Sequence, residues 1–140
     1  MLRHTPREAH DQVVHVSPHS GRRYVMRVAT LADRDALADV YLTCRRHTFT
    51  WVDPSQYQRT DFIEDTDGER VLVCEFAGQI VGFSGVWLQD SFLHHLFIVE
   101  AHQGQGAGLG LLRTTMRDIP GPVRLKCVVQ NERALRFYTK

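Results

Sequence analysis

A glycine-rich segment in the C-terminal half of the chain constrains the possible folds more than any other feature. An apolar, strand-like run at Phe97–Val99 is followed by Gln103–Gly108, which holds three glycines, and then by an amphipathic stretch predicted as a helix over 108–118. Glycines allow positive φ and let a ligand approach the main chain. In such a loop, successive N–H groups and the positive end of the helix converge, which suits a phosphate or pyrophosphate.

Two other nucleotide-binding loops fit this segment less well. A P-loop ends in Gly-Lys-Ser/Thr, whereas Gly108 is followed by Leu109 and Gly110. A dinucleotide fingerprint that begins at Gly104 has Leu109 at its third glycine position, and no acidic residue follows at the required distance.

The rest of the chain shows strand and helix patterns in a simple order. Strands are predicted at 24–29, 70–76, 79–87, 93–99 and 123–129, and Ala77-Gly78 marks a hairpin between the second and third. Thr30 and Asp33 resemble a capping box before a helix at 31–47, a loop and short helix follow over 48–68, and Asn131 opens a last helix. We predict one α/β (α+β) domain over 24–140, with a mixed central sheet and helices on both faces. Residues 1–23 have no sustained period and are predicted as a flexible leader.

Composition narrows the class of partner. The net charge of +1 provides no basic field for nucleic acid. No apolar run reaches the roughly 20 residues that span a bilayer, and the N-terminus lacks the apolar core of a secretory signal. We therefore expect a cytoplasmic protein with neither a nucleic-acid nor a membrane partner. The histidines of the leader lack tight pairing and the three cysteines show no CxxC spacing, so no metal is expected.

Two motifs together resemble those of the Gcn5-related N-acetyltransferases (GNAT). Gln103–Gly108 matches the family's Gln/Arg-x-x-Gly-x-Gly/Ala loop, and Asn131–Tyr138 is similar to its Asn-x-x-Ala-x-x-Phe-Tyr segment. The resemblance implies acetyl-CoA as co-substrate and transfer of the acetyl group to a primary amine of a small molecule or protein. It implies a catalytic role for Tyr138, as the acid that protonates the departing thiolate. The implied cofactor-binding residues are Phe97, Ile98, Val99, Gln103, Gly104, Gln105, Gly106, Ala107, Gly108 and Asn131.

The base that deprotonates the amine is harder to assign. Strand alternation sends His94 and His95 to opposite faces of the sheet, so one of them should look toward the cleft. Some relatives in the family use strand histidines to pass protons to water. The position at the matching offset from the glycine loop is His94 in this chain, so the resemblance implies His94 as the base. Glu100, Asp90 and a water chain without a dedicated base are the alternatives.

The acceptor side is the part of the site that the pattern leaves open. The chain stops at Lys140, where family members usually continue with further strands, so we expect the C-terminal strands to be missing and a homodimer to cover the exposed edge. A catalytically inactive acyl-CoA-binding sensor or assembly module is the alternative function. Trp51, Tyr57 and Phe62 lie among acidic residues, which favours either a binding wall for a cationic amine or a solvated acidic surface over core aromatics.

Overall fold

A central sheet of six strands, in the spatial order β1 to β6, organises the computed structural model, which describes residues 12–117, 119 and 121–125. Neighbouring strands from β1 to β5 are antiparallel, and β6 runs parallel to β5, so the sheet is mixed as predicted. The strands are β1 (Val13–Val16), β2 (Arg23–Val28), β3 (Arg70–Phe76), β4 (Gln79–Trp87), β5 (Phe92–Ile98) and β6 (Arg124–Leu125).

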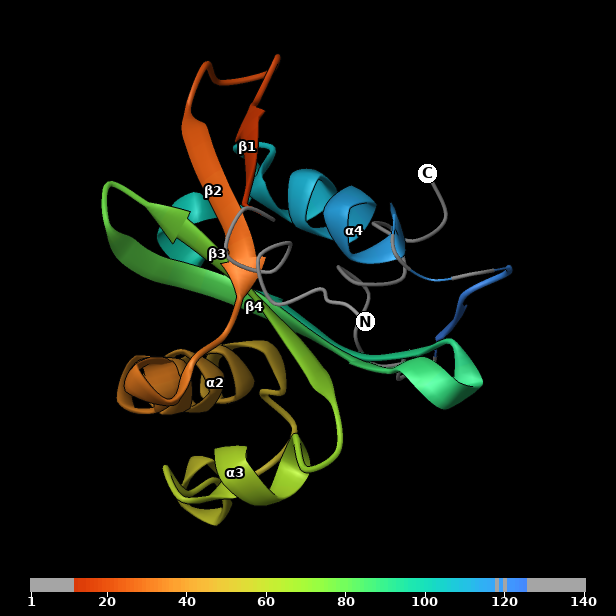
Figure 1. The fold of residues 1–140 in the computed structure, drawn as a ribbon. Coiled ribbons are helices and arrows are strands. Elements are labelled where there is room, and N and C mark those ends of the chain that lie inside the picture. The colour runs from red at the N-terminus through yellow and green to blue at the C-terminus, as the bar shows by residue number, and fades with distance from the viewer. Residues whose placement is uncertain (1–11, 118, 120, 126–140) are drawn as a thin grey trace.

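Helices cover both faces of this sheet (Figure 1). On one face lie α2 (Arg34–Thr48) and the short α3 (Asp61–Asp65), and on the other lies α4 (Ala107–Arg117). Four single-turn 3₁₀ helices complete the elements: η1 (Leu31–Asp33), η2 (Pro54–Gln56), η3 (Leu88–Asp90) and η4 (Glu100–His102). None of the helices in these residues is long and apolar enough to cross a membrane.

Alternating side chains of the central strands build a separate core against each helical layer. Met26, Cys74 and Ile98 pack with Leu111 of α4, whereas Val73 and Phe83 pack with side chains of α2. Because successive strand residues point to opposite faces, one strand can supply both cores, which explains the nearly continuous apolar runs of β3 and β4. The turn that joins these strands was predicted at Ala77-Gly78, and both residues have positive φ (52° and 81°), as a tight hairpin requires.

The predicted flexible leader is wrong over its second half. Val13–Val16 forms the edge strand β1, which pairs residue for residue with β2, from Val13 opposite Met26 to Val16 opposite Arg23. Ser17 N–H and Arg22 carbonyl then close the turn at 2.9 Å. The β-branched valines of this segment form a strand because β2 offers them a partner, so the folded domain begins well before residue 24.

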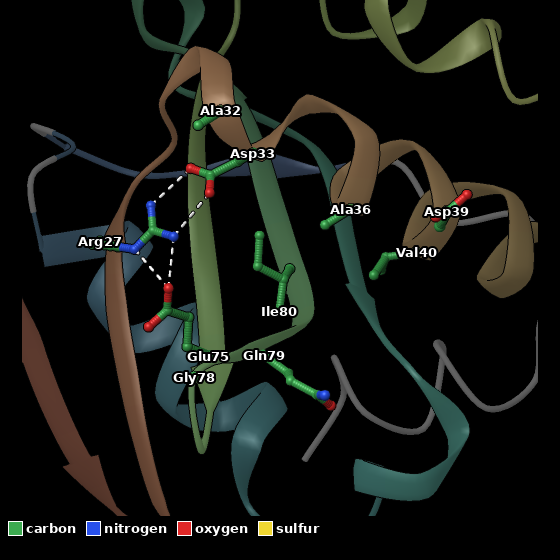
Figure 2. A pocket seen from close by; sticks show the side chains of 10 residues that line it. All are labelled: Arg27, Ala32, Asp33, Ala36, Asp39, Val40, Glu75, Gly78, Gln79 and Ile80. Carbon is green, nitrogen blue, oxygen red and sulfur yellow. Dashed lines mark hydrogen bonds and ion pairs between the residues drawn. The ribbon is translucent and has the colours of Figure 1, made fainter.

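A partly buried ion cluster fixes the start of α2 against the sheet (Figure 2). Arg27 of β2 contacts the carboxylates of Asp33 at 2.7 Å and Glu75 at 2.6 Å. Asp33 also accepts the Thr30 N–H at 2.7 Å, which confirms the predicted capping contact. The hydrogen bond from Arg27 lowers the pKa of Asp33 to about 2. A groove of about 490 Å³ lies beside this cluster, but Arg27, Asp33 and Glu75 satisfy one another there, so we assign the cluster a structural role.

Candidate functional site

The glycine loop has the conformation that its sequence predicts. β5 ends at Ile98, η4 follows, and α4 begins at Ala107, so a strand enters a helix through the loop. Gly104 and Gly106 have φ of 75° and 91°, values that L side chains rarely adopt. The first N–H groups of an α-helix have no partner within the helix, so the N-terminus of α4 offers donors and partial positive charge at the loop.

Side chains tie this loop to its surroundings. The Gln103 side-chain amide donates to the Ile98 carbonyl at 2.9 Å, which anchors the loop to the end of β5. A Cβ at Gly104 would meet nothing within 4 Å, whereas a Cβ at Gly106 would collide with Ser17. In the direction that a side chain would take, Gly104 thus faces open space, whereas Gly106 faces Ser17.

The two strand histidines lie on the same face of the sheet, contrary to the expected alternation. β5 pairs with β4 through Gly85 opposite His95 and then Val86 opposite Leu93, so His94 is the extra residue of a β-bulge. As a result the two imidazole rings lie with centroids 4.0 Å apart. The bulge moves His94 onto the face where His95 packs against Tyr41 and Phe83.

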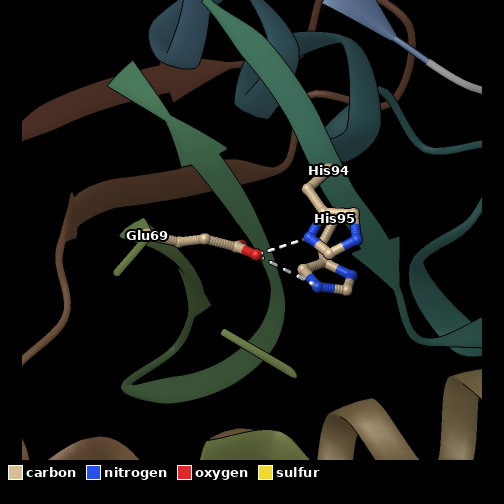
Figure 3. Close-up of side chains that lie close together, drawn as sticks. All are labelled: Glu69, His94 and His95. Atoms are coloured by element: carbon tan, nitrogen blue, oxygen red, sulfur yellow. Dashed lines mark hydrogen bonds and ion pairs between the residues drawn. The ribbon is translucent and has the colours of Figure 1, made fainter. Parts of the chain in front are cut away.

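Both histidines gather around Glu69, a residue that the sequence did not single out (Figure 3). Glu69 Oε2 lies 2.5 Å from His94 Nδ1 and 3.6 Å from His95 Nε2, and the Glu69 side chain has no exposed surface. The carboxylate fits there because Gly85 of β4 has no side chain: a Cβ at this position would collide with Glu69 Oε1. In the sequence, Glu69 follows Asp67-Gly68 and reads as an ordinary loop residue, which gives no sign of burial.

The electrostatics distinguish the two histidines. Burial, and then the neighbouring His94, lower the pKa of His95 to about 4, so its ring is neutral at pH 7. His95 Nε2 also lies 3.2 Å from the Asp65 carbonyl, to which it donates. His94 is 35% exposed and its Nδ1 contacts the carboxylate, which leaves Nε2 for a substrate or water. Burial raises the pKa of the Glu69 carboxyl, and the hydrogen bond to His94 opposes that shift.

The same three residues are the ones that could hold a metal ion in the described ranges. Glu69, His94 and His95 offer ligand atoms that all lie within 4.8 Å of one another. Two of these atoms are, however, joined by the 2.5 Å contact between His94 and Glu69, and His95 Nε2 is bonded to a carbonyl. In the structure these atoms therefore bond to one another and to the main chain, as in a carboxylate–imidazole pair.

The side chain of Arg45 packs against the acidic and aromatic segment between α2 and β3. The Arg45 guanidinium lies 3.9 Å from the ring centre of Tyr41 and 4.4 Å from that of Tyr57. Its Nη2 contacts Asp61 at 3.1 Å, and its side chain is only 8% exposed. The sequence suggested either a wall for a cationic amine or a solvated surface. At Tyr57 the structure shows neither, because the Arg45 guanidinium lies over that ring. Elsewhere in the segment the second alternative holds: Phe62 is buried in the core, and Asp53, Glu64 and Asp67 are exposed.

The remaining candidate residues either lie apart from the His94–Glu69 pair or fall outside the residues that the structure describes. Glu100 is 69% exposed and pairs with His47 at 3.0 Å. Asp90, in η3, accepts through its carbonyl from Arg124. Tyr138 and Asn131, with the predicted final helix, lie outside the described residues, as does most of the strand expected at 123–129.

Comparison with known proteins agrees with this architecture. The acetyltransferase (GNAT) family model matches residues 34–140. No curated protein matches the chain. Among solved structures, apo YjaB from Escherichia coli is 24% identical, with 84% of this chain and 80% of that chain covered and a TM-score of 0.66. A GCN5-related N-acetyltransferase from Rhodopseudomonas palustris is 14% identical, with 91% and 81% covered and a TM-score of 0.68.

A third similar structure contains coenzyme A. The PaiA N-acetyltransferase from Thermoplasma acidophilum, in complex with coenzyme A, is 15% identical, with 83% and 86% covered and a TM-score of 0.66. At these identities the structures demonstrate a shared fold. The family model goes further, because it matches most of the chain, residues 34–140. This chain therefore belongs to the acetyltransferase (GNAT) family and is an acyltransferase.

Proposed function

We propose that this chain transfers the acetyl group of acetyl-CoA to a primary amine of a small molecule or protein by direct attack. The observation that carries the proposal is the arrangement along β5: the His94–Glu69 pair lies at its start and the glycine loop follows its end. From His94 to Ile98 the strand rises about 3.3 Å per residue, or about 13 Å in all. The strand thus places the proton acceptor about 13 Å from the strand end that leads into the glycine loop, which suits an extended thioester arm.

We assign the proposed cofactor residues to β5, to the glycine loop and to the predicted last helix. Gln103–Gly108 would hold the pyrophosphate through loop and helix N–H groups. Phe97–Val99 would pair with the pantetheine arm as a neighbouring strand does. Within the described residues, β6 pairs with β5 at Phe92 and Leu93 alone. This pairing ends before Phe97–Val99, the part of β5 that is proposed to pair with the arm. Asn131 stays the proposed contact for the arm, at the start of the helix predicted from the sequence.

The chemistry follows from the charge that must move. An alkylamine with a pKa near 10 is protonated at pH 7 and must lose a proton before its nitrogen can attack the thioester. In the proposal, His94 Nε2 accepts that proton, directly or through water, while Glu69 holds the ring and balances the resulting imidazolium. The nitrogen forms its bond to the acetyl carbon, and a backbone N–H of β5 would stabilise the negative carbonyl oxygen. The C–S bond then breaks, Tyr138 protonates the thiolate, and the second proton that leaves the nitrogen restores the Tyr138 hydroxyl through water.

The setting of the reaction is also part of the proposal. We place it in the cytoplasm, where thiols stay reduced, and the unpaired Cys44 and Cys74 fit that setting. We also propose a homodimer, for which sedimentation is the test. The exposed edge strand β1, with Val14 and Val16 half exposed, offers one surface for a second copy.

Calorimetric titration of the chain with acetyl-CoA, ATP and NAD tests the cofactor assignment. The proposal expects saturable binding of acetyl-CoA alone, followed by release of free CoA thiol when an amine is added. Preference for ATP or NAD would contradict it. Binding without thiol release across a broad amine panel would instead support the inactive acyl-CoA-binding module.

A further inference from the structure

The hairpin formed by β1 and β2 lies directly behind the glycine loop. Ser20 Oγ, in the turn of this hairpin, donates to the Gln105 carbonyl at 2.7 Å across 85 positions of sequence. Ser17 fills the space that a Cβ would take at Gly106, and the His15 ring does the same at Gly110 in the first turns of α4. The hairpin thus contacts the loop and the start of the helix at three successive points.

The same hairpin also contacts His102, the residue just before the loop. His102 Nδ1 lies 2.9 Å from the Tyr24 hydroxyl and 3.1 Å from Arg22 Nη1. Because a guanidinium can only donate, this ring nitrogen acts as the acceptor for Arg22. Tyr24 is completely buried, so the contact starts from a rigid part of the sheet.

The Ser20 contact determines the direction of one particular N–H group. The carbonyl and N–H of a planar trans peptide point in opposite directions. When Ser20 holds the Gln105 carbonyl toward the hairpin, the Gly106 N–H of that peptide must point away from it. The Gly106 carbonyl accepts the Gly110 N–H at 3.2 Å, as the first helical bond of α4. The Gln105–Gly106 peptide precedes that bond, and Gly106 has a φ of 91°, so the Ser20 contact is what holds this peptide.

We propose that Ser20 is a positioning residue for the cofactor site: it aims the Gly106 N–H at the pyrophosphate of acetyl-CoA. This inference rests on the proposed function. Without the hydroxyl, the Gln105–Gly106 peptide is free to rotate, and the cofactor must order it on binding. The cost falls on the pyrophosphate and on no other part of the cofactor, because the peptide contacts neither the thioester nor the amine.

A pair of acetyl donors separates this role from a general structural one. Acetyl-CoA carries the pyrophosphate, and acetyl-pantetheine carries the same thioester without it. For Ser20→Ala we expect Kd and KM for acetyl-CoA to rise about fivefold to tenfold, the worth of one hydrogen bond, with kcat unchanged. With acetyl-pantetheine, kcat/KM should equal that of the wild type. Ser20→Thr keeps the hydroxyl and should restore the affinity for acetyl-CoA.

Ser55→Ala is the matched control, because Ser55 also makes a local hydroxyl contact, to Asp53 at 2.9 Å, but lies in η2. It should leave both donors unaffected. A Ser20→Ala variant that matches the wild type with both donors would overturn the inference. An equal loss with both donors, or a loss with a matching fall in Tm, would also overturn it, because the hairpin would then support the fold in general. If the wild-type chain does not bind acetyl-CoA, the proposed function is refuted, and this inference with it.

Discussion

His94 Nδ1 lies 2.5 Å from Glu69 Oε2, although 25 positions separate the two residues in the sequence. The carboxylate is closed to solvent, while the imidazole is 35% exposed. A buried carboxylate that accepts from one imidazole nitrogen fixes the ring and leaves the other nitrogen available for a proton. This relationship makes His94 the proton acceptor in our account, because His95 is buried and its Nε2 is bonded to the Asp65 carbonyl.

Replacing His94 by glutamine should slow turnover and leave cofactor binding intact. We expect kcat/KM for the amine to fall about 100-fold, the usual contribution of a general base, with Kd for acetyl-CoA unchanged. His47→Gln is the matched control, because His47 also faces a carboxylate, that of Glu100, at an exposed position. Steady-state kinetics and calorimetry check both variants. Normal turnover in His94→Gln would show that a water chain without a dedicated base suffices.

Replacing Glu69 by glutamine should change activity and stability in opposite directions. The amide keeps the shape but loses the charge that holds His94, so turnover should fall about tenfold. Burial raises the pKa of Glu69, so the folded state binds more protons than the unfolded state near and above the ordinary pKa of 4.5, and stability falls as pH rises. The variant should therefore gain free energy of unfolding relative to the wild type toward neutral pH. Urea unfolding at several pH values measures this, and loss of both activity and stability would indicate a purely structural role.

Stability should fall on acidification because of His95. Its pKa is about 4 in the folded protein against 6.5 ordinarily, so between these values the unfolded state binds more protons. The free energy of unfolding should then decrease as pH falls from about 6.5 to about 4, by an amount on the order of 3 kcal/mol at most. His95→Gln should flatten this part of the curve, whereas His47→Gln should retain it. A His95→Gln curve with the same slope as the wild type over this range would contradict the assignment, because the opposing contribution of Glu69 is present in both proteins.

The glycine loop is best tested at Gly104. A Cβ there meets nothing within 4 Å, whereas one at Gly106 would disturb Ser17 and confuse a binding defect with a packing defect. Asn and Asp both tolerate positive φ and have nearly the same shape, so Gly104→Asn and Gly104→Asp form a matched pair. The aspartate should weaken acetyl-CoA binding about tenfold more than the asparagine, because like charges repel across a short distance. The difference should shrink at high salt, and equal affinities at low salt would place the phosphates elsewhere.

Local sequence patterns predicted the elements that hold the site. Strands β3 and β4 have the predicted bounds, and Ala77-Gly78 forms their turn. The loop at Gln103–Gly108 also has the predicted strand-to-helix setting. These features depend on neighbours in the sequence, namely apolar period and glycine spacing. β1 was missed because four residues of strand pattern give a weak signal until β2 pairs with them.

The chemistry of the pair could not be read in the same way. The bulge at His94 breaks strand alternation, and one sequence offers no mark of a bulge. Glu69 is buried because Gly85, on a different strand, leaves room for its carboxylate. Arg45 occupies the aromatic wall for a similar reason, since it reaches Tyr57 and Asp61 from a helix earlier in the chain. Each of these contacts joins distant segments and has no local signature.

Amine-dependent release of CoA thiol from acetyl-CoA tests the central claim most directly. The assay compares the wild type with His94→Gln over a panel of primary amines, and mass spectrometry identifies the acetylated product. Our account predicts that at least one amine accelerates thiol release and becomes acetylated by the wild type, and that His94→Gln binds acetyl-CoA equally well but turns over far more slowly. Selective binding of acetyl-CoA with no acetylated product from any amine would contradict it.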